Sequence, residues 1–329
     1  MSQNRIIDGL NCATVSRQQF ALTLTGGVST INLTIISPWL DLGPALAELA
    51  RTLVDIEAMS DLATIVRSTA EIRQAREKGR LGIIMGTQNS ALVEDDLALL
   101  DILYRLGFRI LQPTYNERNR LGDGATVSSD GGLSELGRQW VHEMNRLAML
   151  IDLSHCGYRT GADAIETSAD PCIFSHANAR ALCDSPRNKP DELIRLIADR
   201  GGVTGAVGWT PALCRTRRPT IEDLLDQIEY LANLTGIEHV SFASDLSEGI
   251  YRDAKTWDRK FGRNGMYPSL TGVLGDWYTY EHRFPAGFES LAHAGRVWNG
   301  LVKRGYGEDA VEKIMGGNLM RVFTQVWRG

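Results

Sequence analysis

The chain has 329 residues, of which 43% are hydrophobic and 23% charged, a composition that excludes a disordered protein and supports a sizeable core. Its net charge is −5, so the chain lacks the excess of basic residues that is typical of a nucleic-acid-binding protein. No apolar run reaches the roughly 18 residues that a membrane span needs. We therefore expect a globular protein whose partners include neither nucleic acid nor membrane.

Cysteine usage and the N-terminus bear on the cellular compartment. The five cysteines are odd in number and show no C-x-x-C spacing, so reduced thiols are the simplest interpretation. The first residues lack the apolar segment of a signal peptide. Both features lead us to expect a cytoplasmic protein.

Short apolar runs alternate with helical patterns along the chain. The predicted strands are Ile6–Leu10, Val28–Thr34, Leu81–Gln88, Arg109–Tyr115, Met149–His155, Pro171–His176, Gly201–Val207 and Val240–Asp245. The predicted helices include Leu46–Met59, Thr64–Lys78, Asp95–Leu106, Leu133–Leu147, Asp191–Ala198 and Ile221–Leu234. Eight strands alternating with helices favour a closed (β/α)8 TIM barrel. No G-x-G-x-x-G follows a strand, which weakens a dinucleotide-binding alternative.

We expect one domain over residues 1–329, because no repeat, low-complexity tract or linker divides the chain. Residues 249–285 form an insertion rich in aromatic, glycine and charged residues directly after the eighth strand. A segment this long is typical of a lid over the barrel mouth or of an interface between subunits, and both interpretations stay open.

Polar residues end several predicted strands, where barrels of this type place their active sites. His155 and His176 end the fifth and sixth strands, and Asp245 ends the eighth. Two imidazoles and a carboxylate at one mouth are suited to hold a divalent metal ion and to accept a proton from its bound water. The alternative is that each is a structural residue, with Asp245 capping a helix.

Several segments resemble the membrane (renal) dipeptidases, peptidase family M19 of the amidohydrolase-like barrels. They are EMNRLAMLIDLSH at residues 143–155, IFSHANAR at 173–180, PRNKPD at 186–191, and GNLMRVF at 317–323. The resemblance implies a barrel mouth that holds two zinc ions, where a bridging hydroxide attacks a dipeptide. It matches His155 and His176 to the histidines of the second metal site. It also matches Arg187 to the arginine that binds the substrate carboxylate, and Asp245 to the aspartate that handles protons.

The sequence departs from that family at the first metal site. Leu10 and Cys12 stand where the family has His-x-Asp, Gln88 replaces the bridging glutamate, and Tyr115 replaces a histidine that contacts the reacting carbonyl. Without a bridging carboxylate, two dications roughly 4 Å apart would repel each other by several kcal/mol. We therefore expect at most one zinc ion, on His155 and His176, completed by water and by Gln88 as a weak ligand or by Asp245; an empty site stays open as the alternative.

Three functions stay open at this point. The first is a hydrolase that cleaves a dipeptide or similar N-acyl amino acid, with Arg187 and Asn116 binding the substrate, Asp245 moving protons and Tyr115 donating a hydrogen bond to the oxyanion. The second is a metal-free enzyme of changed chemistry on a small carboxylate. The third is a non-catalytic carboxylate-binding protein. A homodimer is expected from the family resemblance.

Overall fold

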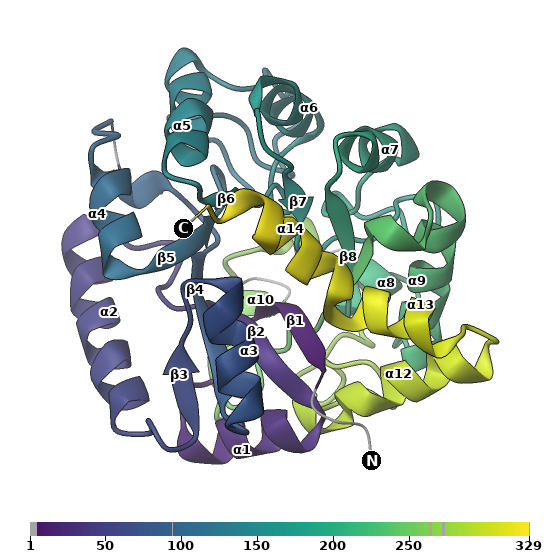
Figure 1. Cartoon of the computed structure of the whole chain (residues 1–329). Coiled ribbons are helices and arrows are strands. Elements are labelled where there is room, and N and C mark those ends of the chain that lie inside the picture. The colour runs from purple at the N-terminus through teal and green to yellow at the C-terminus, as the bar shows by residue number, and fades with distance from the viewer. Residues whose placement is uncertain (1–4, 94, 263–264, 272–273, 329) are drawn as a thin grey trace.

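The computed structural model describes residues 5–93, 95–262, 265–271 and 274–328. Eight parallel strands form a ring, each a short, mostly buried apolar run (Figure 1). They are β1 (Ile6–Asn11), β2 (Val28–Thr34), β4 (Leu81–Thr87), β5 (Phe108–Leu111), β6 (Leu150–Ile151), β7 (Ile173–Phe174), β8 (Val203–Val207) and β9 (Val240–Ala243). The predicted (β/α)8 barrel is confirmed.

The ring consists of two arcs, β1 to β6 and β7 to β9, which meet at two seams. At the β6–β7 seam a single bridge pairs Asp152 with Ile173. At the β9–β1 seam the Asp245 amide donates to the Leu10 carbonyl at 3.1 Å. A regular ladder is replaced at both places by isolated contacts.

A buried aspartate ties each seam together. Asp8 of β1 accepts hydrogen bonds from the Ser244 amide (2.7 Å) and hydroxyl (2.5 Å) across the β9–β1 seam. Asp152 accepts from the Ser175 amide (3.0 Å) and hydroxyl (2.5 Å) across the β6–β7 seam. Each carboxylate takes the place of a missing backbone ladder, because a buried polar backbone needs partners.

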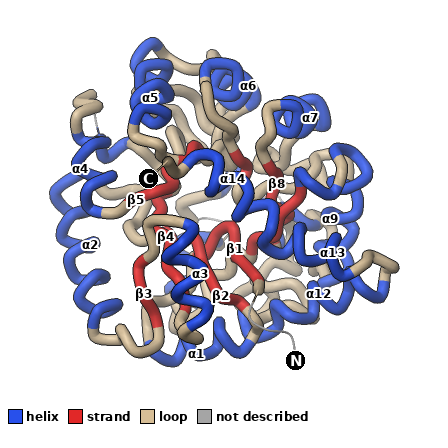
Figure 2. Tube along the Cα trace, viewed as in Figure 1, coloured by secondary structure: helices blue, strands red, loops and turns tan. Residues whose placement is uncertain are grey.

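Helices surround the strands, as the blue segments around the red ones in Figure 2 show. They are α1 (Arg17–Thr25), α2 (Leu42–Glu57), α3 (Thr69–Glu77), α4 (Leu99–Leu106), α5 (Glu135–Arg146), α6 (Tyr158–Thr167), α7 (Asp191–Asp199), α8 (Thr210–Leu213), α9 (Ile221–Thr235), α10 (Ala254–Phe261), α11 (Pro268–Thr271), α12 (Ala294–Lys303), α13 (Glu308–Glu312) and α14 (Asn318–Val326). Helix α14 lies across the front of the barrel in Figure 1. Its Leu319 and Phe323 pack in one apolar cluster with strand residues such as Ile7 and Ile173, so α14 covers one end of the barrel.

No helix in the described ranges is both long and apolar enough to cross a membrane.

The structure corrects several predicted bounds. The helix predicted from Thr64 begins only at Thr69, because a short strand, β3 (Ala63–Ile65), pairs with β4 first. The helices predicted from Leu46 and Asp95 begin at Leu42 and Leu99.

The strands predicted to end at His155 and His176 end at Ile151 and Phe174, so both histidines stand in the loops that follow. Tyr115 and Asp245 likewise lie beyond β5 and β9. Tyr115, His155 and Asp245 line a cavity from these loops, at positions where the apolar runs alone indicated continued strand.

The described part of the 249–285 insertion lies at the barrel end opposite α14. It contains α10 and α11, and its residues form one wall of a cavity with loops that follow the strands. Trp257 of α10 is 2% exposed and stacks edge-on against Tyr278 at 5.0 Å between ring centroids. This aromatic packing fixes α10 over the mouth.

Candidate active site

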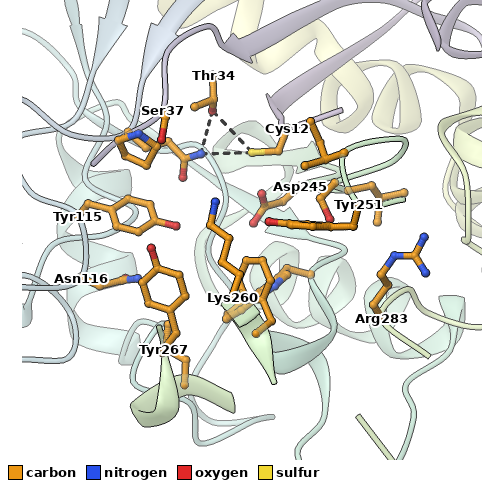
Figure 3. A pocket seen from close by; sticks show the side chains of 18 of the residues that line it. Cys12, Thr34, Ser37, Tyr115, Asn116, Asp245, Tyr251, Lys260, Tyr267 and Arg283 are labelled. Carbon is orange, nitrogen blue, oxygen red and sulfur yellow. Dashed lines mark hydrogen bonds between the residues drawn. The ribbon is translucent and has the colours of Figure 1, made fainter. Parts of the chain in front are cut away.

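A cavity of about 330 Å³ opens at the C-terminal ends of the barrel strands. This volume lies at the lower end of the range for small-molecule sites. The predicted site residues that line it are Cys12, Gln88, Tyr115, Asn116, His155, Arg187 and Asp245. Figure 3 shows Tyr115 and Asn116 on one side of this space and Asp245 and Tyr251 on the other. The structure therefore brings most of the predicted site together.

His176 and Leu10 do not line the cavity. His176 is fully buried behind His155, and the two Nε2 atoms are 2.9 Å apart. Leu10 packs in a small apolar cluster with Val207 and Ala243. Its side chain therefore serves the core where the family resemblance calls for a metal ligand.

The partners of the two imidazoles fix their tautomers. The Ser175 hydroxyl donates its proton to Asp152, so it accepts from Nδ1–H of His176 at 2.6 Å. Asn116 Oδ1 lies 2.7 Å from Nδ1 of His155 and accepts from it. Both Nε2 atoms then carry lone pairs. Ligating histidines are typically oriented in this way, by an acceptor on the other ring nitrogen.

Gln88 adds a third acceptor to this pair. Its amide nitrogen donates to Thr34 Oγ1 at 2.8 Å and contacts Cys12 Sγ at 3.2 Å, which directs Oε1 at His155 Nε2, 2.7 Å away. Three atoms that can each bind a metal ion thus converge, the two Nε2 atoms 2.9 Å apart and Gln88 Oε1 2.7 Å from one of them. Burial, reinforced by Arg187, holds the pKa of both imidazoles well below 6.5, which disfavours an imidazolium at this point. Neutral imidazole is the form that binds metal.

These donors fit one metal ion and do not fit two. Within the described residues no group of three or more His, Cys, Asp or Glu side chains is placed to hold a metal, so a third protein ligand would have to be the weaker carboxamide of Gln88. The thiol of Cys12 is partly buried, and its pKa is raised well above 9.0 by desolvation and by Asp245. A protonated thiol and an apolar Leu10 leave the first site without a competent ligand set.

Asp245 faces the cavity in a strained backbone conformation. Its φ of 47° lies in the left-handed region, as does the φ of 56° at Asn116, and non-glycine residues held there often mark functional sites. Burial raises the pKa of the Asp245 carboxyl to about 7, although a hydrogen bond from Cys12 opposes that rise. A carboxyl that titrates near neutrality is suited to proton transfer.

Two buried basic side chains stand behind His155. Arg187 donates to the Ser154 carbonyl and Lys189 to the Cys156 carbonyl at 2.7 Å, so together they grip the loop that carries His155. Arg187 also reaches the cavity wall. A guanidinium keeps donors free for a carboxylate after one bond to a carbonyl.

Sequence reasoning missed part of the aromatic wall. Trp39, from the loop after β2, packs edge-on against Tyr115 at 5.3 Å, and Tyr115 stacks on the His155 ring at 4.0 Å. Lys260 of α10 also lines the cavity and lies 3.8 Å from the Trp39 ring centroid. Its position three residues after Trp257 is the signal that could have placed it on the inward face of α10.

Comparisons with known proteins identify relatives of this chain. The family model for membrane dipeptidases, peptidase family M19, matches residues 44–276. The chain is 27% identical to dipeptidase verJ of Clonostachys rogersoniana over 273 residues, which cover 82% of this chain and 62% of that protein. It is 33% identical to an uncharacterized dipeptidase of Schizosaccharomyces pombe over 202 residues, covering 60% and 48%. The chain spans about half of the length of the curated relatives that it matches.

Solved structures extend the similarity over the whole chain. An amidohydrolase from Pseudomonas aeruginosa superposes with a TM-score of 0.89 at 34% identity, covering 99% of this chain and 97% of that one. A metallo peptidase from Rhodobacter sphaeroides, liganded with a phosphinate mimic of the dipeptide L-Ala-D-Ala, shares the fold with a TM-score of 0.80 at 20% identity, covering 98% and 99%. With most of its length matched by the family model, this chain belongs to the membrane dipeptidase family, peptidase family M19.

Proposed function

We propose that this protein hydrolyses the amide bond of a dipeptide or a similar small N-acyl amino acid with a free carboxylate. The observation that carries the proposal is the convergence of two imidazole lone pairs and one carboxamide oxygen beside a cavity of dipeptide size. Family membership supports the same reaction class. The three donors would hold one zinc ion, which when bound supplies Lewis acidity and a more acidic water.

Arg187 and the aromatic wall position the substrate. The guanidinium at the base of the cavity offers paired donors to the terminal carboxylate. Asn116, whose Oδ1 is engaged by His155, keeps its amide group for the substrate backbone. Tyr115 is held by its stack on His155, and burial raises the pKa of its hydroxyl well above 10.0, so the hydroxyl stays protonated and donates to the oxyanion.

Asp245 moves the protons. As a carboxylate it removes a proton from the attacking water, whose oxygen bonds to the scissile carbon. It then returns that proton to the leaving nitrogen as the C–N bond breaks, so the two products are an amine and a carboxylic acid. A pKa of about 7 serves both directions, because either protonation state is accessible at neutral pH.

Metal analysis combined with a substrate panel tests the proposal. We expect close to one zinc per chain in protein purified without chelator, and loss of that zinc in the His155→Ala/His176→Ala double variant. Dipeptides with L- and D-residues at the C-terminal position should be hydrolysed by the zinc-loaded protein. Absence of hydrolysis across the panel with added Zn²⁺, Mn²⁺ or Co²⁺ would reject dipeptidase activity.

A further inference from the structure

We propose that Lys260, on helix α10, supplies at the degenerate first metal site the positive charge that stabilises the oxyanion. The inference rests on the proposed amide hydrolysis and adds a residue of the insertion to the catalytic centre. It follows from the direction of the side chain, from the absence of an ion pair with any described carboxylate, and from what surrounds it.

The phase of α10 directs Lys260 inward. The helix begins after Asp253, whose side chain accepts from the Thr256 amide at 2.7 Å. Trp257 is its buried anchor, so Lys260, one turn later, lies on the same face. Lys255 is exposed on the same helix. Figure 3 shows the Lys260 amine pointing into the cavity between Tyr115 and Asp245.

The ammonium group forms no ion pair with a carboxylate among the described residues, although Glu48 attracts it electrostatically. Among the described residues no carboxylate oxygen lies within 4.0 Å of Lys260 Nζ, which instead lies 3.8 Å from the centroid of the Trp39 ring. Glu48, which also lines the cavity, is engaged by the Ser37 amide at 2.8 Å. A half-buried cation that is held by an aromatic face and forms no ion pair with a described carboxylate is available to an anion that forms in the cavity.

The neighbourhood is that of the lost metal site. Lys260 lines the same cavity as Cys12, the residue at the position of the missing aspartate, and partial burial lowers the pKa of its ammonium. Cys12 in turn contacts Gln88, the residue in place of the bridging glutamate. Two adjacent metal dications need a bridging carboxylate to offset their repulsion, whereas one metal ion beside a single ammonium charge needs it less. A lysine in place of the first metal ion is therefore consistent with the neutral Gln88 at the position of the bridging glutamate.

Trp39 links this charge to the other oxyanion donor. Its ring contacts both residues: Lys260 Nζ lies 3.8 Å from the ring centroid, and the Tyr115 ring lies 5.3 Å away between centroids. Figure 3 shows the Lys260 amine beside the Tyr115 hydroxyl, so the two groups reach the same part of the cavity from α10 and from the loop after β5. Preorganised donors of this kind act on charge that develops in the transition state, where removing one typically costs about 10²–10³ in rate.

Lys260→Met is the test, with Lys260→Arg as the conservative variant and Lys255→Met as the matched control on the exposed face of α10. We expect Lys260→Met to lower kcat by about 100-fold with KM changed less than about 3-fold, and Lys260→Arg to recover part of the loss. Lys255→Met should match the parent. Affinity for a phosphinate dipeptide mimic, a tetrahedral anion, should fall in Lys260→Met by a factor similar to kcat, while affinity for the product amino acid should not change.

The outcomes separate this inference from the proposed function. A parent protein that neither hydrolyses dipeptides nor binds the phosphinate would reject the function itself. A parent that hydrolyses them, together with a Lys260→Met variant that keeps kcat and phosphinate affinity, would reject the role of Lys260 alone. Equal losses for the phosphinate and the product would assign Lys260 to ground-state binding and likewise overturn the proposal.

Discussion

Lys189 offers a quantitative test of how the His155 loop is held. Its side chain is 3% exposed, donates to the Cys156 carbonyl at 2.7 Å and lies 5.2 Å above the Phe174 ring. Burial, with Arg187 nearby, lowers the pKa of the ammonium from 10.5 to about 7. The perturbation is Lys189→Met, which keeps the unbranched apolar stem and removes the charge.

The sign and size of the effect follow from proton linkage. Between pH 7 and 10.5 the unfolded chain binds a proton at Lys189 that the folded chain does not, so this group makes the free energy of unfolding rise with pH. The whole shift corresponds to about 5 kcal/mol, and each pH unit within the window to about 1.4 kcal/mol. From pH 7 to pH 9 the parent should therefore gain about 2–3 kcal/mol relative to Lys189→Met.

Urea unfolding at pH 7, 8 and 9 measures this difference. Lys255→Met, an exposed substitution, is the control and should follow the parent at each pH. The quantity to compare is the change in ΔG of unfolding with pH, because the lost hydrogen bond to Cys156 shifts the variant equally at every pH. A constant difference between parent and Lys189→Met from pH 7 to pH 9 would refute a buried, deprotonating lysine.

Three further predictions address the site and its cover. With the Asp245 pKa at about 7, kcat/KM should rise roughly tenfold from pH 6 to pH 8. Bound zinc that lowers this pKa would move the same rise to lower pH. If the rise persisted in Asp245→Asn, Asp245 would be excluded as the base. Gln88→Glu puts a carboxylate 2.7 Å from His155 Nε2 and should tighten zinc binding at least tenfold in a chelator competition, whereas unchanged affinity would remove Gln88 from the ligand set. Trp257→Ala should lower the free energy of unfolding by about 3–5 kcal/mol in urea denaturation, because it empties the anchor of α10, and a loss below about 1 kcal/mol would show that α10 is held elsewhere.

Apolar runs predicted the barrel because a parallel strand buried on both faces needs a continuous hydrophobic segment. The same apolar runs led us to predict strands that continue to His155 and His176, whereas the strands end earlier. The loops that follow them are also buried, so their residue types resemble those of a strand. The sequence pattern missed β3 because three residues are too few to show a period.

The chemistry of the site was predictable where residue type decides it. An apolar Leu10 and a neutral Gln88 already argued against a second metal ion. The inward direction of Lys260 and the packing of Trp39 depend on how distant segments meet, which local sequence does not encode. The tautomers of His155 and His176 likewise depend on Asn116 and Ser175, and so on the folded hydrogen-bond network.

A metal ion bound by both histidines would also stabilise the barrel, because the two histidines lie on opposite sides of one seam. His155 follows β6, the last strand of the larger arc, and His176 follows β7, the first strand of the smaller arc. An ion bound by both would link the two arcs at the β6–β7 seam, where a single bridge replaces the backbone ladder. Cys12 and Asp245 face each other across the other seam. Uptake of an ion at about one hundred times its dissociation constant would add about 2.7 kcal/mol to the free energy of unfolding. Loss of the ion would then loosen the barrel at the seam that holds both of its proposed histidine ligands.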